Sequence, residues 1–167
     1  MAARQPLFPL SSVPWLATGV AVAALCIALI AQYGFGLAPC ELCYWQRYGY
    51  WAAIGIGVVA IFSPAGSALR RVLLWLLALA FLATAGIALF HVGVEQKWWQ
   101  GLATCSGDLG GAVSTQDILS AIENAPIVRC DEPAFVLFGI SMAGYNLILA
   151  LALALFTLRG ALRSKAA

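Results

Sequence analysis

Four long stretches without any charged residue dominate the chain. They cover residues 5–40, 48–69, 72–94 and 133–158. A membrane-spanning helix needs about 20 apolar residues, so each stretch holds one such helix and none comfortably holds two. The pattern therefore predicts an all-α integral membrane protein, in which one four-transmembrane-helix bundle forms a single domain over residues 1–167. The expected spans are about 14–36, 43–62, 70–92 and 134–158.

Composition supports this fold class. The chain is 63% hydrophobic and 10% charged, whereas soluble domains carry about 25% charged residues. The apolar run from Pro14 to Leu37 exceeds the roughly 7–15 residues of a signal-peptide core, so we expect it to be a span that is not cleaved. The net charge of +2 gives no sign of nucleic-acid binding.

The charges are distributed unevenly between the two ends of the predicted bundle. Four spans place both termini and the 63–71 turn on one side, which carries six basic residues and no acid. The other side carries all seven acids and three basic residues. The positive-inside rule assigns the first side to the cytoplasm. We therefore expect a bacterial inner-membrane protein with cytoplasmic termini and two periplasmic loops, 37–42 and 93–133.

The second periplasmic loop predicts a short interfacial helix. Ser114 and Asp117 form a capping box, and the apolar positions after it recur at helical spacing. We expect this helix to lie on the membrane surface. Pro133 suits the first turn of the fourth span.

Four of the five cysteines fall on the periplasmic side. These are Cys40, Cys43, Cys105 and Cys130, and in an oxidising compartment they can form two disulfides. Cys26 lies inside the first span, where we expect it to be a small buried apolar residue.

The Cys40–Cys43 pair has the spacing of a redox-active disulfide at the predicted start of the second span. Arg47 follows Cys43 by four positions, so the two share a helix face. A thiolate beside a helix N-terminus and a cation, at the edge of the lipid, suits electron exchange with a lipid-dissolved partner. Alternatively, Arg47 extends to the lipid headgroups. His91, at the same expected depth, is either an interfacial residue or a proton-handling and ligand-contacting group.

Cys105 and Cys130 are 25 positions apart in a glycine-rich loop. A bridge between them would be exposed and open to thiol–disulfide exchange. Two alternatives remain: both bridges are inert staples, or the cysteines bind a metal. The metal alternative is disfavoured because Cys105 and Cys130 do not form a second close pair, and no metal site is expected.

The segment Cys40-Glu41-Leu42-Cys43-Tyr44-Trp45-Gln46-Arg47 resembles the Cys-x-Leu-Cys-x-x-x-Arg motif of the DsbB family of membrane oxidoreductases. The resemblance extends over nearly the whole chain. It implies that a reduced periplasmic DsbA-like oxidase attacks a Cys105–Cys130 disulfide, with Cys105 forming the mixed disulfide. Electrons then pass to Cys40–Cys43, and Cys43 reduces a quinone from the membrane pool, ubiquinone or menaquinone.

In this relay the resemblance implies that Arg47 stabilises the Cys43 thiolate and the reduced quinone, and that His91 lies near the quinone. One alternative is a paralogue dedicated to a single thiol partner. The vitamin K epoxide reductase-like family shares the chemistry, but normally places its Cys-x-x-Cys late in the chain. A structural membrane protein with two inert disulfides is the alternative from another functional class.

Overall fold

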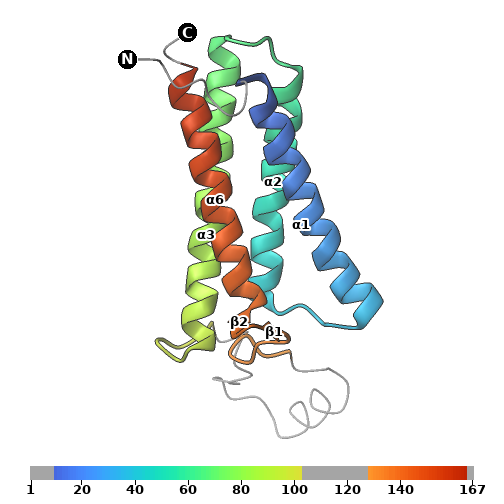
Figure 1. Ribbon diagram of the computed structural model, residues 1–167. Coiled ribbons are helices and arrows are strands. Elements are labelled where there is room, and N and C mark those ends of the chain that lie inside the picture. Colours follow the sequence, from blue (N-terminus) through green and yellow to red (C-terminus); the bar gives the residue numbers. More distant parts are fainter. Residues whose placement is uncertain (1–9, 103–127, 165–167) are drawn as a thin grey trace, which may run out of the picture.

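The computed structural model describes residues 10–102 and 128–164, and in this part of the chain four long helices form a bundle (Figure 1). A short 3₁₀ turn, η1 (Leu10–Ser12), leads into α1 (Val13–Phe35), α2 (Glu41–Phe62) and α3 (Ala68–Glu95), and the strands β1 (Val136–Leu137) and β2 (Ile140–Ser141) precede α6 (Met142–Arg163). α3 packs along both α2 and α6, whereas α1 packs mainly on α2. Apart from this small hairpin, the described part of the chain is all-α, as predicted.

Three of the helices are long and apolar enough to cross a membrane: α1, α3 and α6. α2 does not meet the same test, because its first turns carry Glu41, Gln46 and Arg47. Its 22 residues rise about 1.5 Å each, so the helix is still long enough to cross a hydrocarbon core about 30 Å thick. That all four helices span the membrane therefore stays a prediction.

The outward faces of the helices are strongly apolar. Trp15, Phe62, Leu79 and Ile148 each expose more than half of their surface, which fits helices surrounded by hydrocarbon. Cys26 is also exposed on α1, so the expectation that it is buried was wrong. Its side chain lies on the outward face of α1, away from the helix–helix contacts.

The core lies where α3 meets the other helices. Leu77 and Phe81 of α3 are completely buried, together with Ala17 and Ala21 of α1. Tyr50 of α2 meets Phe81 edge to face, with 6.1 Å between ring centroids. The two alanines present little more than backbone to the core, which lets α1 lie close to its neighbours.

The fourth long helix begins at Met142, so the prediction of a helix from residue 134 was wrong. β1 and β2 pair in an antiparallel hairpin instead, and the turn between them has positive φ at Phe138 (51°) and Gly139 (77°). Residues with a left-handed backbone do not fit inside a right-handed helix, so α6 begins only after this turn. The Ser141 hydroxyl caps its first turn by accepting from Gly144 N at 3.1 Å. α1, α2 and α3 coincide with the predicted segments to within three residues.

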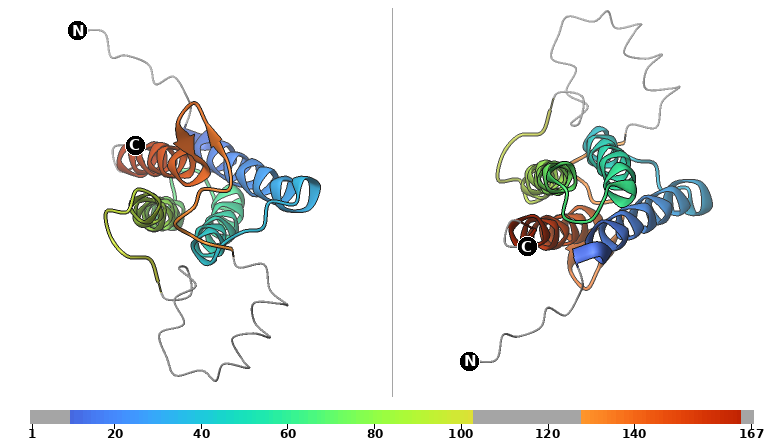
Figure 2. Two further views of the ribbon diagram at one scale, coloured as in Figure 1. Left: turned by 90° about the horizontal axis from the view of Figure 1, so that it is seen from below. Right: turned by 90° about the horizontal axis from the view of Figure 1, so that it is seen from above.

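The two ends of the bundle differ. The start of α1 and the end of α6 lie together at one end, whereas the start of α2, the end of α3 and the β-hairpin lie at the other, here called the cysteine end (Figure 1). α1 diverges from the other helices as it approaches the cysteine end (Figures 1 and 2).

Candidate functional site

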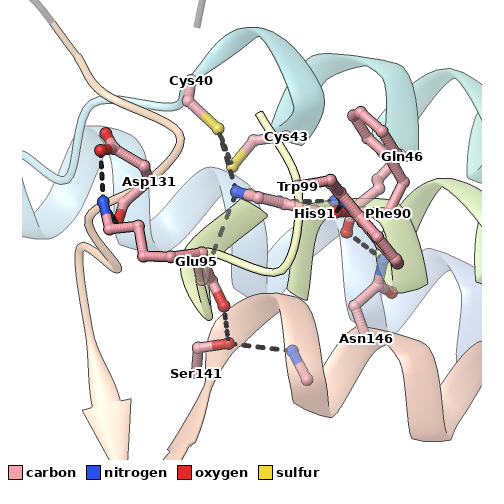
Figure 3. A network of polar contacts seen from close by, with 12 residues as sticks. Cys40, Cys43, Gln46, Phe90, His91, Glu95, Trp99, Asp131, Ser141 and Asn146 are labelled. Carbon is pink, nitrogen blue, oxygen red and sulfur yellow. Dashed lines mark hydrogen bonds and ion pairs between the residues drawn. The ribbon is translucent and has the colours of Figure 1, made fainter. Parts of the chain in front are cut away.

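The Cys40–Cys43 pair forms the N-terminus of α2. Cys40 is the N-cap residue, with an extended backbone, and its carbonyl accepts from Tyr44 N at 3.2 Å. Cys40 is buried and Cys43 is half-buried, and both are free thiols. Their sulfurs lie 2.9 Å apart (Figure 3), whereas a disulfide bond measures about 2.05 Å. A small movement of either side chain would allow the bond to form. The Cys40–Cys43 disulfide itself stays a prediction.

The two thiols are not equivalent. The hydrogen bond with Cys43, together with burial, raises the pKa of the Cys40 thiol, and the contact with His91 opposes this rise. The Cys40 thiol therefore keeps its proton to a higher pH than an ordinary cysteine does. Cys43 is the more exposed of the two, and both border the cavity described below.

His91, in the last turns of α3, lies directly against this pair. Its Nε2 is 3.6 Å from Cys40 Sγ and 3.8 Å from Glu95 Oε1. Its Nδ1 is 2.9 Å from the amide nitrogen of Gln46. His91, which is 5% exposed, therefore has a thiol and a carboxylate at its Nε2 and an amide at its Nδ1.

A chain of buried polar groups extends from His91 across the bundle (Figure 3). Asn146 of α6 donates to Gln46 Oε1, and the Tyr50 hydroxyl donates to Asn146 Oδ1 at 2.6 Å. At the other side of the ring, Ser141 donates to Glu95 Oε2. These contacts join α2, α3 and α6 around the imidazole and fix its orientation.

Arg47 does not reach back to Cys43 through a hydrogen bond. Its guanidinium donates to Gln32 Oε1 and to the Ala28 carbonyl at 3.2 Å, both on α1, and lies 5.5 Å from the centre of the Tyr44 ring. The side chain thus spans the space between α1 and α2.

A cavity of about 640 Å³ occupies the space between α1 and the rest of the bundle at the cysteine end. Its polar lining includes Cys40, Cys43, Arg47, His91, Glu95 and Asn146. Alanine and leucine side chains of α1 and α6 form much of the remainder. Cavities of this size and character hold small ligands, so a cofactor with an apolar body and a polar ring would fit against the thiols.

Cys130 lies in the same buried cluster as Cys40, Leu42 and Val94, with Cys43 packed at its edge. It is completely buried and takes part in a disulfide. Cys105 lies outside the described residues, so the predicted Cys105–Cys130 pairing stays a prediction. The interfacial helix expected after Ser114 also lies outside them.

The segment around Cys130 is attached to the end of α3 by an ion-pair network. Asp131 accepts from Lys97 and from Arg129 at 2.8–2.9 Å. The contact with Arg129, followed by that with Lys97, holds the pKa of the Asp131 carboxyl well below its ordinary value. Trp99 stacks on Phe90, with 5.9 Å between ring centroids, and donates to its carbonyl, which folds the chain after Lys97 back onto α3.

The structure brings Cys40, Cys43, Arg47 and His91 to one cavity, with Cys130 beside it. Sequence reasoning missed the contributions of Gln46, Glu95, Ser141 and Asn146 to the site. Asn146 carried a usable signal, because a polar side chain inside an apolar span generally has a function or a buried partner. Glu95 also carried a signal, because it lies four positions after His91 and residues at that spacing share a helix face.

Comparisons with known proteins identify the family. The family described as "Disulfide bond formation protein DsbB" matches residues 11–159. Two proteins named "Disulfide bond formation protein B" are each 30% identical to the chain: that of Chromohalobacter salexigens over 73% of both chains, and that of Herminiimonas arsenicoxydans over 84% of this chain and 88% of its own. An uncharacterized protein of Rickettsia prowazekii is 32% identical over 82% of this chain and 79% of its own.

No solved structure matches the chain. The family match confirms the resemblance predicted from the cysteine motif, and it agrees with the three helices that are apolar enough to cross a membrane. The chain therefore belongs to the DsbB family of membrane oxidoreductases, whose role in bacteria is disulfide bond formation.

Proposed function

We propose that the protein is a thiol:quinone oxidoreductase of the bacterial inner membrane that regenerates the disulfide of a periplasmic DsbA-like oxidase. The partner gives up two electrons and two protons as its dithiol becomes a disulfide, and a quinone takes them up to become a quinol. The observation that carries the proposal is the position of Cys40 and Cys43 on the wall of the 640 Å³ cavity that Arg47 and His91 also line.

The first transfer would carry electrons from the partner to Cys105–Cys130 and from there to Cys40–Cys43. A partner thiolate attacks a Cys105–Cys130 disulfide, and the thiol released attacks a Cys40–Cys43 disulfide in turn. Cys130 packs in the same buried cluster as Cys40. The exchange therefore needs only a local movement of the segment that carries Cys130.

The second transfer would take place in the cavity. A quinone has a flat apolar ring with two carbonyl acceptors, and the cavity offers apolar walls together with the guanidinium of Arg47 and the imidazole of His91. Cys43 borders the cavity at a helix N-terminus, where a thiolate is stabilised by the helix dipole. Electrons leave the pair as the Cys40–Cys43 disulfide forms. Either ubiquinone or menaquinone satisfies this arrangement.

The proposal includes a topology. α2 crosses the membrane together with α1, α3 and α6, which gives four spans. The termini are cytoplasmic, and the cysteine end faces the periplasm. This places the second loop within reach of a soluble partner and the cavity at the depth where membrane quinones diffuse.

A reconstituted turnover assay tests the proposal. The full chain in detergent receives a reduced thioredoxin-fold oxidase and a soluble quinone analogue, and quinone absorbance is followed. We expect quinone loss that is abolished by Cys43→Ser and by Cys130→Ser. Cys26→Ser provides the matched control, because Cys26 is exposed on α1 and does not line the cavity.

Two results would change the proposal. Turnover with a small dithiol but not with the general oxidase would indicate a dedicated thiol partner. No turnover with either donor, together with disulfides that resist exchange, would favour a structural membrane protein.

A further inference from the structure

We propose that the reduced form of the protein binds one Zn²⁺ ion through Cys40, Cys43 and His91. The two sulfurs and one imidazole nitrogen all lie within 4.8 Å of one another. The sequence alone does not predict this site, because His91 is 51 positions from Cys40. In zinc motifs that can be read from a sequence, each cysteine or histidine ligand has a second one within about five positions, and His91 has no other cysteine or histidine that close. The inference goes beyond the proposed electron relay and does not depend on it.

The distances suit a tetrahedral zinc site. Zn²⁺ binds thiolate sulfur at about 2.3 Å and imidazole nitrogen at about 2.0–2.1 Å, so a sulfur and a nitrogen on one ion lie about 3.5 Å apart. Cys40 Sγ and His91 Nε2 are 3.6 Å apart. Two sulfurs on one ion lie about 3.8 Å apart, so the 2.9 Å separation of Cys40 and Cys43 has to widen. Cys43 borders the cavity, which gives its side chain room for that movement.

The chemistry also favours zinc. The two thiols lose their protons to the solvent as the ion binds, and two thiolates then neutralise the charge of Zn²⁺. Soft sulfur ligands with an imidazole select zinc over magnesium or calcium. Three protein ligands leave one position of the ion for water, and the adjoining cavity can accommodate it.

His91 must present a lone pair at Nε2, and the surrounding amides permit this. In the described arrangement the Gln46 amide N–H points at Nδ1, so a neutral ring carries its proton on Nε2. If the Gln46 and Asn146 amides turn over together, Gln46 Oε1 accepts from Nδ1–H, and Gln46 donates to Asn146 Oδ1. Asn146 then donates to the Tyr50 hydroxyl, which is its partner in the present orientation as well. Both amides therefore have partners in both orientations, and the Tyr50 hydroxyl changes from donor to acceptor.

The charged neighbours are compatible with a bound cation. Glu95 Oε1 lies 3.8 Å from His91 Nε2 and adds negative charge beside the site. The Arg47 guanidinium lines the same cavity, but it is directed to Gln32 and to the Ala28 carbonyl on α1. Zinc binding and disulfide formation exclude each other, because each requires the same two sulfurs. The ion therefore holds the pair reduced until it leaves.

Zinc titration of the full chain in detergent tests the site. A Cys105→Ser/Cys130→Ser background removes the other cysteine pair, and the protein is reduced and freed of reductant. Zn²⁺ is then added in competition with a chromogenic chelator. We expect one ion per chain in the reduced protein and none after Cys40 and Cys43 have been oxidised. Cys26→Ser, the matched control, should leave the stoichiometry unchanged.

Variants of the three ligands separate this site from adventitious binding. We expect Cys40→Ser and His91→Ala each to weaken zinc binding by at least about 10-fold. Cobalt provides a second readout: bound Co²⁺ should show the visible bands of a tetrahedral site with thiolate charge transfer, and His91→Ala should shift them. Gln46→Glu should tighten binding by about 10-fold, because a carboxylate only accepts from Nδ1–H and leaves Nε2 free for the metal.

Three results would overturn the proposal. The first is a reduced protein that takes up no zinc in competition with the chelator. The second is a Cys40→Ser/Cys43→Ser variant that binds as much zinc as its parent. The third is a His91→Ala variant with unchanged affinity and cobalt spectrum. Gel filtration establishes that each variant is folded, and since no quinone or thiol partner is added, failure of the turnover assay leaves the zinc result standing.

Discussion

At the scale of single residues, Arg47 differs from its sequence-based interpretation. Its spacing placed it on the same helix face as Cys43, yet its guanidinium makes its hydrogen bonds to α1, at Gln32 and the Ala28 carbonyl. Arg47 is thus a wall of the cavity that links α2 to α1. Its positive charge still borders the space in which a quinone would be reduced.

Replacing Arg47 with Ala should impair quinone reduction without affecting thiol exchange at Cys130. A hydrogen bond to a charged group contributes about 1.5–3 kcal/mol, so KM for the quinone should rise about 10- to 100-fold. Arg47→Lys keeps the charge but not the two-pronged geometry, and its KM should be intermediate. Steady-state kinetics with a quinone analogue measure both variants, and an unchanged KM in Arg47→Ala would leave the residue with only a structural role, as a link between α2 and α1.

Asp131 gives a pH prediction. Arg129 and Lys97 hold the pKa of its carboxyl below the ordinary value of 3.8, so its ion pairs stabilise the folded state fully above pH 4. This stabilisation is lost as pH falls below the ordinary pKa towards the lowered one. Thermal melting of Asp131→Asn in detergent should therefore lie a few degrees below wild type at pH 6, and the difference should shrink below pH 4. A difference that is constant across this range would mean that Asp131 acts only through its shape.

At the scale of elements, α2 is closely packed at two of its glycines. A Cβ at Gly49 would lie 2.0 Å from the Thr84 hydroxyl oxygen of α3, and one at Gly57 would lie 2.1 Å from that of Thr18 on α1. At Gly55 nothing lies within 4 Å. The absence of a side chain at Gly49 and Gly57 therefore lets α2 approach α3 and α1 closely, whereas Gly55 has no such role.

Alanine at these positions should separate packing from helix propensity. Gly49→Ala and Gly57→Ala force α3 or α1 away and should each cost about 1–3 kcal/mol. Gly55→Ala is the matched control and should be neutral or stabilising by up to about 1 kcal/mol, because alanine favours the helix. Thermal melting in detergent distinguishes them, and equal effects at all three positions would contradict this packing.

The elements also show why the sequence predicted some features and missed others. Apolar runs of sufficient length specified α1, α2 and α3, but the run after Pro133 is equally apolar and the chain forms a hairpin there. The left-handed turn at Phe138 and Gly139 leaves no clear trace in the hydrophobic pattern. Likewise, Gln46 and Asn146 are 100 positions apart in the sequence. No local spacing can reveal that they are in contact.

At the scale of the whole molecule, charge follows the long axis of the bundle. Among the described residues, the end opposite the cysteines carries Arg70, Arg71, Arg159 and Arg163 and no acid. The described acids, Glu41, Glu95, Asp131 and Glu132, are all at the cysteine end. With the positive-inside rule, this asymmetry orients the bundle, provided that α2 crosses the membrane along with α1, α3 and α6.

The position of α2 can be tested by labelling single cysteines on either side of it. In a background without native cysteines, Ala38→Cys lies before α2, Ala65→Cys lies between α2 and α3, and Gln100→Cys follows α3; all three positions are exposed. We expect a membrane-impermeant maleimide to label positions 38 and 100 from the periplasm. Position 65 should react only after the inner membrane has been permeabilised. Labelling of positions 38 and 65 from the same side would mean that α2 does not cross, and the two termini would then lie on opposite sides of the membrane.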